Sequence, residues 1–139
     1  MSEDITFSII KPDAFSKGNS GRILARISEA GFRIAALKML HMTRSQAESF
    51  YEVHRGRPFY EGLVEFMSSG PVIVFVLSHP NAVEEFRNLI GPTDPAKAAP
   101  GTIRAEFGAD VRMNAVHGSD SSENARRESS FFFSAIEIF

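Results

Sequence analysis

The sequence predicts an α+β domain in which helices pack on one side of a mainly antiparallel sheet. Three observations support this class. Strand-like and helix-like segments alternate along the 139 residues, the expected strands carry apolar faces, and no shift in composition marks a second domain. Because the order is strand, helix, strand, helices, strand, helix, a split βαβ arrangement is the simplest architecture. We therefore expect a single domain over residues 1–139.

The first elements are a strand, a helix and a second strand. Apolar and polar residues alternate over positions 5–9, which predicts a strand with one buried face that residues 11–13 end. Residues 20–30 place apolar side chains at helical spacing, and Gly31 is a candidate left-handed C-cap. Residues 34–42 predict a strand that is partly buried on both faces.

Two helices and a central strand follow. Residues 43–46 fit a capping box, so a helix begins there. One side of this helix is expected to carry Ala47, Phe50, Tyr51 and His54. Pro58 suits the first turn of a further helix, which Gly70 ends. The buried stripe of that helix is expected to contain Phe59, Leu63, Phe66 and Met67. Residues 72–77 form a continuous apolar run, which predicts a strand covered on both faces.

A long loop interrupts this alternation. Asn81 is expected to cap a helix that Gly91 closes, and its apolar side holds Val83, Phe86, Leu89 and Ile90. Residues 91–108 contain three prolines, and ordered loops of this length are uncommon unless they have a function.

The last elements are short. Residues 115–116 predict an edge strand, and Asp120 or Ser121 is expected to cap a final helix that runs to about Ser130. The phenylalanines at 131–133 are expected to anchor the tail to the body of the domain.

Composition excludes several classes of protein. Fifteen Lys and Arg against 17 Asp and Glu give a net charge of −2, which does not indicate a nucleic-acid or anionic-membrane partner. The absence of cysteine excludes disulfides, thiol catalysis and thiolate metal sites. The longest apolar run, residues 71–77, is too short to cross a bilayer, and residues 1–4 show no signal-peptide pattern. We expect a cytoplasmic protein without a membrane partner.

The segment 114–121, with the sequence NAVHGSDS, carries the strongest chemical signal. The sequence contains no Walker A loop, no G-x-G-x-x-G fingerprint and no H-E-x-x-H motif. His117 instead lies at a strand end just before a helix N-terminus, where free backbone N–H groups favour phosphate. A neutral imidazole can attack phosphorus without a separate base if its ring is oriented. Glu128, one helix later, is a candidate for the orienting hydrogen bond.

Each candidate also has a structural interpretation. The sequence contains four histidines, and a single histidine is more often a structural hydrogen-bonding group than a nucleophile. Strand-end lysines and isolated arginines are by default surface charges, and aromatic residues on apolar stripes are by default core. The residues with such an alternative are Lys11, Tyr51, Phe59, Arg87, Arg104 and Asn114. Residue type and spacing alone leave both interpretations open.

Six segments together resemble the nucleoside diphosphate kinase family in its bacterial form. They are IKPD at 10–13, GFR at 31–33, RPFY at 57–60, SGPV at 69–72, PGTIR at 100–104 and the segment 114–121. The resemblance extends from residue 5 to about residue 133. Two departures are the phenylalanines at 131–133, where many members carry a tryptophan, and an end at Phe139 that is earlier than in eukaryotic members.

The resemblance implies a ferredoxin-like α+β sandwich, in which helices cover a four-stranded antiparallel sheet and a long nucleotide-site loop spans about 91–114. It implies transfer of the terminal phosphate of a nucleoside triphosphate, mainly ATP, to nucleoside diphosphates through a phosphohistidine. Mg²⁺ is expected to arrive on the nucleotide phosphates, with Asp120 as an outer-shell contact and no site held by protein alone. A homo-oligomer is expected, with a tetramer favoured over a hexamer or dimer. The alternative is a catalytically silent module that binds nucleotide or nucleic acid.

The resemblance also assigns roles to residues. The catalytic group is His117 as nucleophile, Glu128 as its orienting partner, Lys11 and Ser119. In the nucleotide site, Phe59 stacks on the base opposite Val111, and Lys11 also contacts the ribose. The full nucleotide-binding set is Lys11, Tyr51, His54, Phe59, Leu63, Arg87, Thr93, Arg104, Val111 and Asn114.

Overall fold

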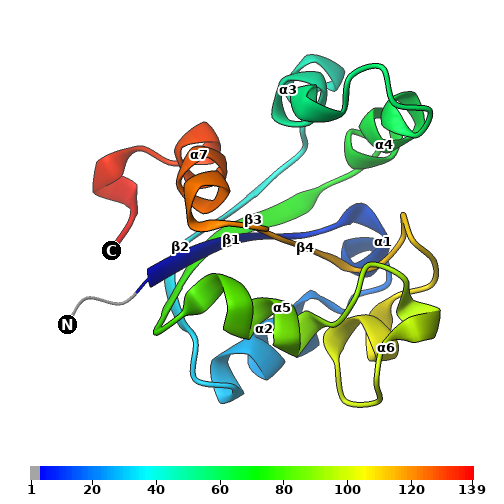
Figure 1. Ribbon diagram of the computed structural model, residues 1–139. Helices are drawn as coiled ribbons and strands as arrows, with labels where there is room; N and C mark the ends of the chain where they lie inside the picture. Colours follow the sequence, from blue (N-terminus) through cyan, green and yellow to red (C-terminus); the bar gives the residue numbers. More distant parts are fainter. Residues whose placement is uncertain (1–3) are drawn as a thin grey trace.

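One four-stranded antiparallel sheet organises residues 4–139, the part of the chain that the structure, a computed structural model, describes (Figure 1). The strands are β1 (Asp4–Ile10), β2 (Arg33–Leu40), β3 (Val72–His79) and β4 (Val116–Gly118). Their order is β2-β3-β1-β4, and each neighbouring pair is antiparallel. The antiparallel sheet that the sequence predicts is confirmed. The signal-peptide expectation involves residues 1–3, which lie outside the described residues.

Helices cover both faces of this sheet, so the prediction of helices on one side is wrong (Figure 1). The helices over one face are α3 (Arg44–Phe50), α4 (Tyr60–Met67) and α7 (Ser122–Phe132). Those over the other are α1 (Pro12–Ser16), α2 (Ser20–Glu29), α5 (Ala82–Ile90) and α6 (Ile103–Phe107). Each layer buries its own apolar core against the sheet. None of the helices in residues 4–139 combines the length and apolar character that a bilayer crossing requires.

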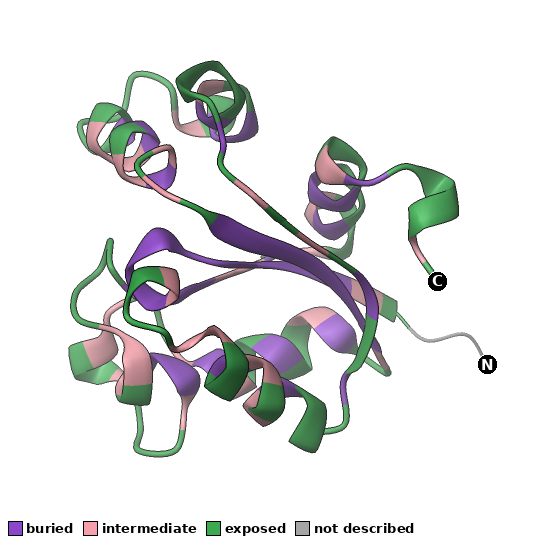
Figure 2. Cartoon of the chain, turned by 180° about the vertical axis from the view of Figure 1, so that it is seen from behind, coloured by how far each residue is buried: buried purple, intermediate pink, exposed green. Residues whose placement is uncertain are grey.

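The interior strand β1 explains why the alternation of apolar and polar residues led to a prediction of helices on one face of the sheet. Its alternation predicts one buried face, but Thr6 and Ser8 are as fully buried as Phe7 and Ile9. The strand lies between β3 and β4 in a sheet that has helices over both faces (Figure 2). Its polar side chains are therefore covered by protein and not exposed to solvent. The continuous apolar run of β3, by contrast, correctly predicts a strand buried on both faces.

Local signals fix most element boundaries. Thr43 and Gln46 form the expected capping box of α3, and Ser121, not Asp120, caps α7. Asn81 precedes α5 in a left-handed conformation, but its side chain donates to Glu84 and caps no backbone group. The short helix α1 was not predicted. The remaining short helices are the 3-10 turns η1 (Glu52–His54), η2 (Pro95–Lys97) and η3 (Ala135–Glu137).

The segment 91–108 is not a plain loop, because it contains η2 and α6. Phe59 also differs from its predicted place in a buried stripe: its side chain is 45% exposed, just before α4 begins. Of the three tail phenylalanines, Phe133 is buried and Phe131 is exposed. Both the segment and Phe59 border the candidate site described next.

Candidate active site

Strand β4 places His117 at the edge of the sheet beside β1. His117 pairs with Ile9, and its ring contacts the rings of Phe7 and Phe50 at centroid distances of 6.0 and 5.8 Å. These aromatic walls restrict the ring while one side of it borders a cavity. The strand therefore presents an imidazole of fixed orientation to a space that a ligand can enter.

A chain of hydrogen bonds fixes the tautomer of His117. Its Nε2 lies 2.9 Å from Oε1 of Glu128, and the same oxygen accepts a bond of 2.7 Å from the Ser119 hydroxyl. The Ser119 oxygen in turn accepts from the Phe7 backbone N–H at 3.1 Å. Because a carboxylate only accepts, Nε2 carries the proton and Nδ1 keeps its lone pair. The arrangement leaves Nδ1 available as a nucleophile.

The cavity beside His117 has a volume of about 990 Å³, which is the size of a nucleotide-scale site. It brings together residues from across the sequence. The predicted site residues that line it are Lys11, Tyr51, His54, Phe59, Leu63, Arg87, Thr93, Arg104, Val111, Asn114, His117, Asp120 and Glu128. Ser119 does not line the cavity, because it is buried behind Glu128.

Lys11 is buried at the end of β1, so the surface-lysine interpretation is wrong. Its Nζ donates to Oδ1 of Asn114 at 2.8 Å. Burial, together with the charge of Arg104, lowers the pKa of Lys11 to about 8. The Asn114 amide also donates to the carbonyls of Thr93 and Val111, at 3.0 and 3.2 Å. This network ties β1 to both ends of the segment 91–114.

Arg104 is also buried rather than a surface charge. Its guanidinium donates to the backbone carbonyls of Gly91 at 3.0 Å and Val116 at 2.8 Å. Burial first, and then the charge of Arg87, lower the pKa of Arg104 to about 10. The cavity is bordered by four arginines, Arg87, Arg104, Arg112 and Arg127, and by Lys11, and these cations create a positive field suited to phosphate oxygens.

The opposite end of the cavity is apolar and open. Phe59 and Leu63 line it from the α4 side, and Val111, which is 60% exposed, lines it from the loop side. The loop is held by Asp110, whose carboxylate accepts the backbone N–H groups of Arg112 and Met113. These bonds also lower the pKa of Asp110. Two apolar walls of this kind can accept a flat heteroaromatic ring between them.

A row of rings leads from the apolar end toward His117. His54 contacts Phe59 at a centroid distance of 5.2 Å and Tyr51 at 6.4 Å. Burial and the charge of Glu128 raise the pKa of Tyr51, and its buried hydroxyl has no hydrogen-bond partner among the described residues. Tyr51 borders the cavity, and its hydroxyl oxygen is buried.

Sequence reasoning missed several residues that line the cavity. They are Val53, Asp110, Arg112, Met113, Gly118, Asn124 and Arg127. Arg127 had a signal, because it directly precedes Glu128, and its guanidinium lies 3.7 Å from that carboxylate. No local pattern in the sequence indicated Arg112, because its guanidinium packs against Gly62 of α4, which is far away in the sequence.

Three acidic residues are among those that line the cavity, Asp110, Asp120 and Glu128. Within residues 4–139, no group of three or more His, Asp or Glu side chains is placed to hold a metal ion. Asp110 and Asp120 both border the cavity and are exposed, and the Asn124 amide lowers the pKa of Asp120.

Comparison with known proteins agrees with this geometry. The sequence profile of the nucleoside diphosphate kinase family matches residues 4–138. The chain belongs to this family. It is 56% identical over 133 residues to the nucleoside diphosphate kinase of Chlamydia abortus (strain DSM 27085 / S26/3), which covers 96% of this chain and 94% of the relative. The kinase of Chlamydia pneumoniae is also 56% identical, over 96% of this chain and 92% of its own length.

Solved structures of nucleoside diphosphate kinases share the fold. That of Aquifex aeolicus is 51% identical, with a TM-score of 0.95 over 98% of this chain and 99% of its own. That of Halobacterium salinarum, in complex with CDP, is 36% identical, with a TM-score of 0.94 over 99% and 91% of the two chains. The kinase transfers the terminal phosphate of a nucleoside triphosphate to a nucleoside diphosphate by a ping-pong route through a phosphohistidine. Nothing supports the alternative of a silent binding module.

Proposed function

We propose that His117 is the residue that carries the phosphoryl group. Its Nδ1 attacks the γ-phosphorus of the bound triphosphate, a P–N bond forms, and the bond between that phosphorus and the bridging oxygen breaks. The diphosphate leaves with the electron pair of the broken bond. A second diphosphate then attacks the phosphohistidine through a β-phosphate oxygen and restores the imidazole. The observation that supports this proposal is the 2.9 Å contact between Nε2 and Glu128, which leaves Nδ1 as the ring nitrogen with a free lone pair.

The nucleotide is proposed to lie with its phosphates toward His117 and its base toward Phe59. Arg87, Arg104 and Thr93 surround the phosphate end, and they contribute charge and a hydroxyl. Lys11 and Asn114 also line the cavity and are proposed to bind the ribose hydroxyls, with Lys11 also near the transferred group. The base is proposed to stack on Phe59 with Val111 opposite. Tyr51, His54 and Leu63 complete this set.

Members of this family need a divalent cation with the nucleotide. We propose that this cation is Mg²⁺, bound as part of the substrate through the phosphates. Asp120 is the residue proposed to contact its water shell, because its ionised carboxylate borders the phosphate end of the cavity. Replacement of Asp120 by Asn is expected to raise the Mg²⁺ concentration that half-saturates turnover.

The phosphohistidine can be tested directly. The protein is incubated with ATP that carries a radiolabelled γ-phosphate, and the bound label is exposed to acid and to alkali. A phosphoramidate at His117 is expected to be acid-labile and alkali-stable, to map to the peptide containing residue 117, and to pass to added GDP. Acid-stable label, or label on another peptide, would refute the assignment.

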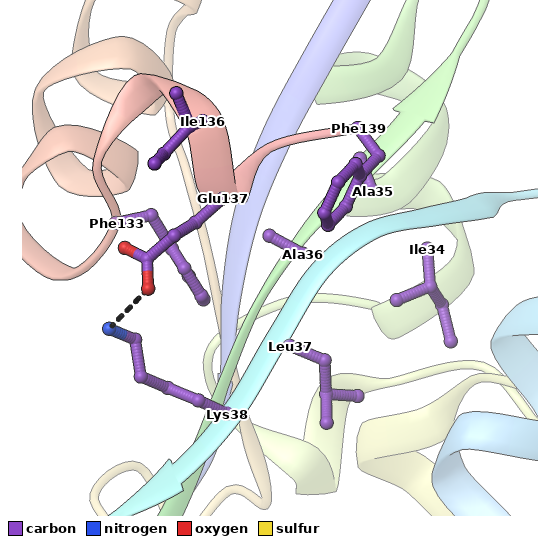
Figure 3. Close-up of a pocket in the computed structure, with 9 residues that line it drawn as sticks. All are labelled: Ile34, Ala35, Ala36, Leu37, Lys38, Phe133, Ile136, Glu137 and Phe139. Atoms are coloured by element: carbon purple, nitrogen blue, oxygen red, sulfur yellow. Dashed lines mark ion pairs between the residues drawn. The ribbon is translucent and has the colours of Figure 1, made fainter.

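We also propose that a second copy of the chain covers the outer edge of β2. This edge strand exposes Ile34, Leu37 and Met39, and a groove of about 440 Å³ runs between it and the carboxyl-terminal segment (Figure 3). In that segment Phe139 donates its backbone N–H to Ala35 and leaves its ring exposed beside the strand. Exposed apolar edges of this kind favour association.

The proposed assembly is a tetramer, favoured over a hexamer or dimer. Sedimentation at several protein concentrations tests it, and Leu37→Asp is expected to shift the protein toward smaller species. A monomer at all concentrations would exclude the proposal.

A single domain over residues 1–139 is proposed because both apolar cores share one sheet. The proposed location is the cytoplasm, and cell fractionation tests it.

A further inference from the structure

The backbone just before His117 is strained. Ala115 has a φ of +75°, and the Val116 N–H donates to the Asn114 carbonyl at 2.9 Å, which closes a tight turn on Ala115. A positive φ at the centre of such a turn is rare and unfavourable for a residue with a Cβ. Among residues 4–139, Asn81 is the other non-glycine residue with a positive φ, and it lies in an exposed turn before α5.

This strained turn connects two functional side chains. Asn114 precedes it and binds the Lys11 ammonium, while His117 follows it by two residues and faces the cavity. A change of φ at Ala115 would rotate one side chain relative to the other. The alignment of the proposed ribose contact and the proposed nucleophile therefore depends on what holds Ala115.

The segment at the end of β1 holds Ala115 from both sides. The Lys11 backbone N–H donates to the Ala115 carbonyl at 2.9 Å, and the Ala115 N–H donates to Oδ2 of Asp13 at 3.2 Å. A backbone strain of this kind persists only where the surroundings fix it by several contacts. The hydrogen bond from Lys11 is made by its backbone. Of the two contacts that fix the conformation of Ala115, the one from Asp13 is therefore the one made by a side chain.

Asp13 is an unusual group for this position. Its side chain does not line the cavity, the residue is only 6% exposed, and its second oxygen is buried without a hydrogen-bond partner among the described residues. Burial raises the pKa of Asp13, and the Ala115 N–H and the Lys11 charge oppose this rise. A buried carboxyl is costly and has no role in packing alone, because an apolar side chain would fill the same space.

We propose that Asp13 is a positioning residue that holds the strained turn at Ala115 and thereby aligns His117 with Asn114 for phosphoryl transfer. This inference rests on the proposed role of His117. Asp13 acts through the backbone and does not touch the nucleotide. Its removal is therefore expected to slow the chemical step and to change nucleotide binding much less.

The test is the rate of His117 phosphorylation by saturating ATP in a single turnover, at a temperature well below unfolding. Asp13→Ala is expected to lower this rate constant by about 100-fold, the size of effect that a displacement of about 1 Å can cause, with KM changed less than about threefold. Asp13→Asn keeps an acceptor oxygen and is expected to stay within about tenfold of wild type. If Asp13→Ala does not fold, Asp13→Ser, whose hydroxyl is too short to reach the Ala115 N–H, takes its place with the same expectation.

A second substitution separates positioning from general stability. Glycine adopts a positive φ without strain, so Ala115→Gly in the Asp13→Ala background is expected to recover at least about tenfold of the lost rate. The same substitution relieves strain but adds backbone freedom, so these opposing effects are expected to change the melting temperature little. Asn81→Gly is the matched control, because it relaxes the other positive-φ position and is expected to leave phosphorylation unchanged.

The outcomes separate this inference from the proposed function. A wild-type protein that forms no label at His117 refutes the nucleophile assignment. A wild-type protein that is labelled, with folded Asp13→Ala labelled within twofold of its rate, overturns the role of Asp13 alone. A rate loss that Ala115→Gly does not recover also overturns it.

Discussion

The imidazole of His117 is prepared for its role by a contact on the far side of its ring. The Glu128 carboxylate holds the proton on Nε2, the Ser119 hydroxyl donates to that carboxylate, and the Phe7 backbone N–H donates to Ser119. Such a chain costs little reorganisation during reaction, because every group is already in place. The alignment is a property of the folded protein before any nucleotide binds.

Replacement of His117 by Ala is expected to abolish the phosphoenzyme and to lower kcat by at least ~10³-fold, because no other group can form the intermediate. Stopped assays of GDP phosphorylation by ATP measure this loss. His41, whose Nε2 contacts the Ser68 carbonyl, and His79, which stacks on Phe32, lie outside the cavity lining. Their Ala variants are the controls, and near-normal exchange by His117→Ala would contradict the assignment.

Lys11 is expected to make the activity depend on pH. Its pKa is lowered to about 8, so the ammonium is charged below that pH and loses its charge as the pH rises through it. We expect kcat/KM to fall above about pH 8, because this parameter reports the free enzyme. In kcat the decline is expected at higher pH, since bound phosphates favour the charged form.

A pH series of initial rates in constant ionic strength measures both parameters. The control is Lys11→Arg, which remains charged over this range and is expected to lose the decline even where its activity is lower. A kcat/KM that stays constant to pH 9.5 in the wild type would contradict a functional charge on Lys11.

The individual residues show where sequence reasoning stops. The segment 114–121 indicated His117, and the family resemblance supplied the distant Lys11 and Arg104, but residue type favoured surface charges at both positions. Asp13 was noted only as the end of a strand. Its importance depends on a contact with Ala115, 102 positions away in sequence, which no local pattern encodes.

At the level of elements, the segment 91–114 depends on a close approach at Gly108. A Cβ there would lie 2.7 Å from Cγ of Pro95, 2.8 Å from the Arg104 carbonyl oxygen and 3.2 Å from Cα of Asn114. Gly108→Ala is therefore expected to cost about 1–3 kcal/mol of unfolding free energy and to raise the KM for nucleotides, because backbone must move. Chemical denaturation and steady-state kinetics measure the two effects.

Gly62→Ala provides the contrasting control. A Cβ there would lie 2.5 to 2.9 Å from the Arg112 guanidinium, which is the free end of an exposed side chain and can turn away. Alanine favours helix by up to about 1 kcal/mol over glycine, so α4 is expected to be unchanged or more stable. If both substitutions lowered the unfolding free energy equally, a clash with backbone atoms would cost no more than a clash with a mobile side chain, and this explanation would be contradicted.

The boundaries of helices were predictable from the sequence where a cap or turn is local. The arrangement of the helices in layers on the sheet was not. Thr43 and Gln46 form their capping box from adjacent sequence alone. The burial of Thr6 and Ser8 depends instead on a second helical layer that covers the other face of β1. The polar residues of β1 therefore predicted a face exposed to solvent, whereas in the fold a second apolar core covers that face.

At the scale of the whole molecule, the base end of the cavity predicts a tolerant enzyme. Phe59 and Val111 offer exposed apolar surface, and stacking on such a surface does not distinguish one base from another. Acceptors GDP, CDP, UDP and their deoxy forms are expected to differ by about tenfold in kcat/KM. Competition between pairs of diphosphates measures this range, and a preference of ~10⁴ for one base would indicate a dedicated recognition group.

The strand order has a consequence for how the enzyme becomes active during its synthesis. Phe7 of β1 and Ser119 beside β4 are bonded across 112 positions of sequence, so a ribosome delivers the two partners far apart in time. Throughout most of its synthesis the growing polypeptide lacks β4, which pairs with β1, and with it His117, the proposed phosphate acceptor. Nascent chains are therefore expected not to consume nucleoside triphosphates before residues 116–118 have joined the sheet.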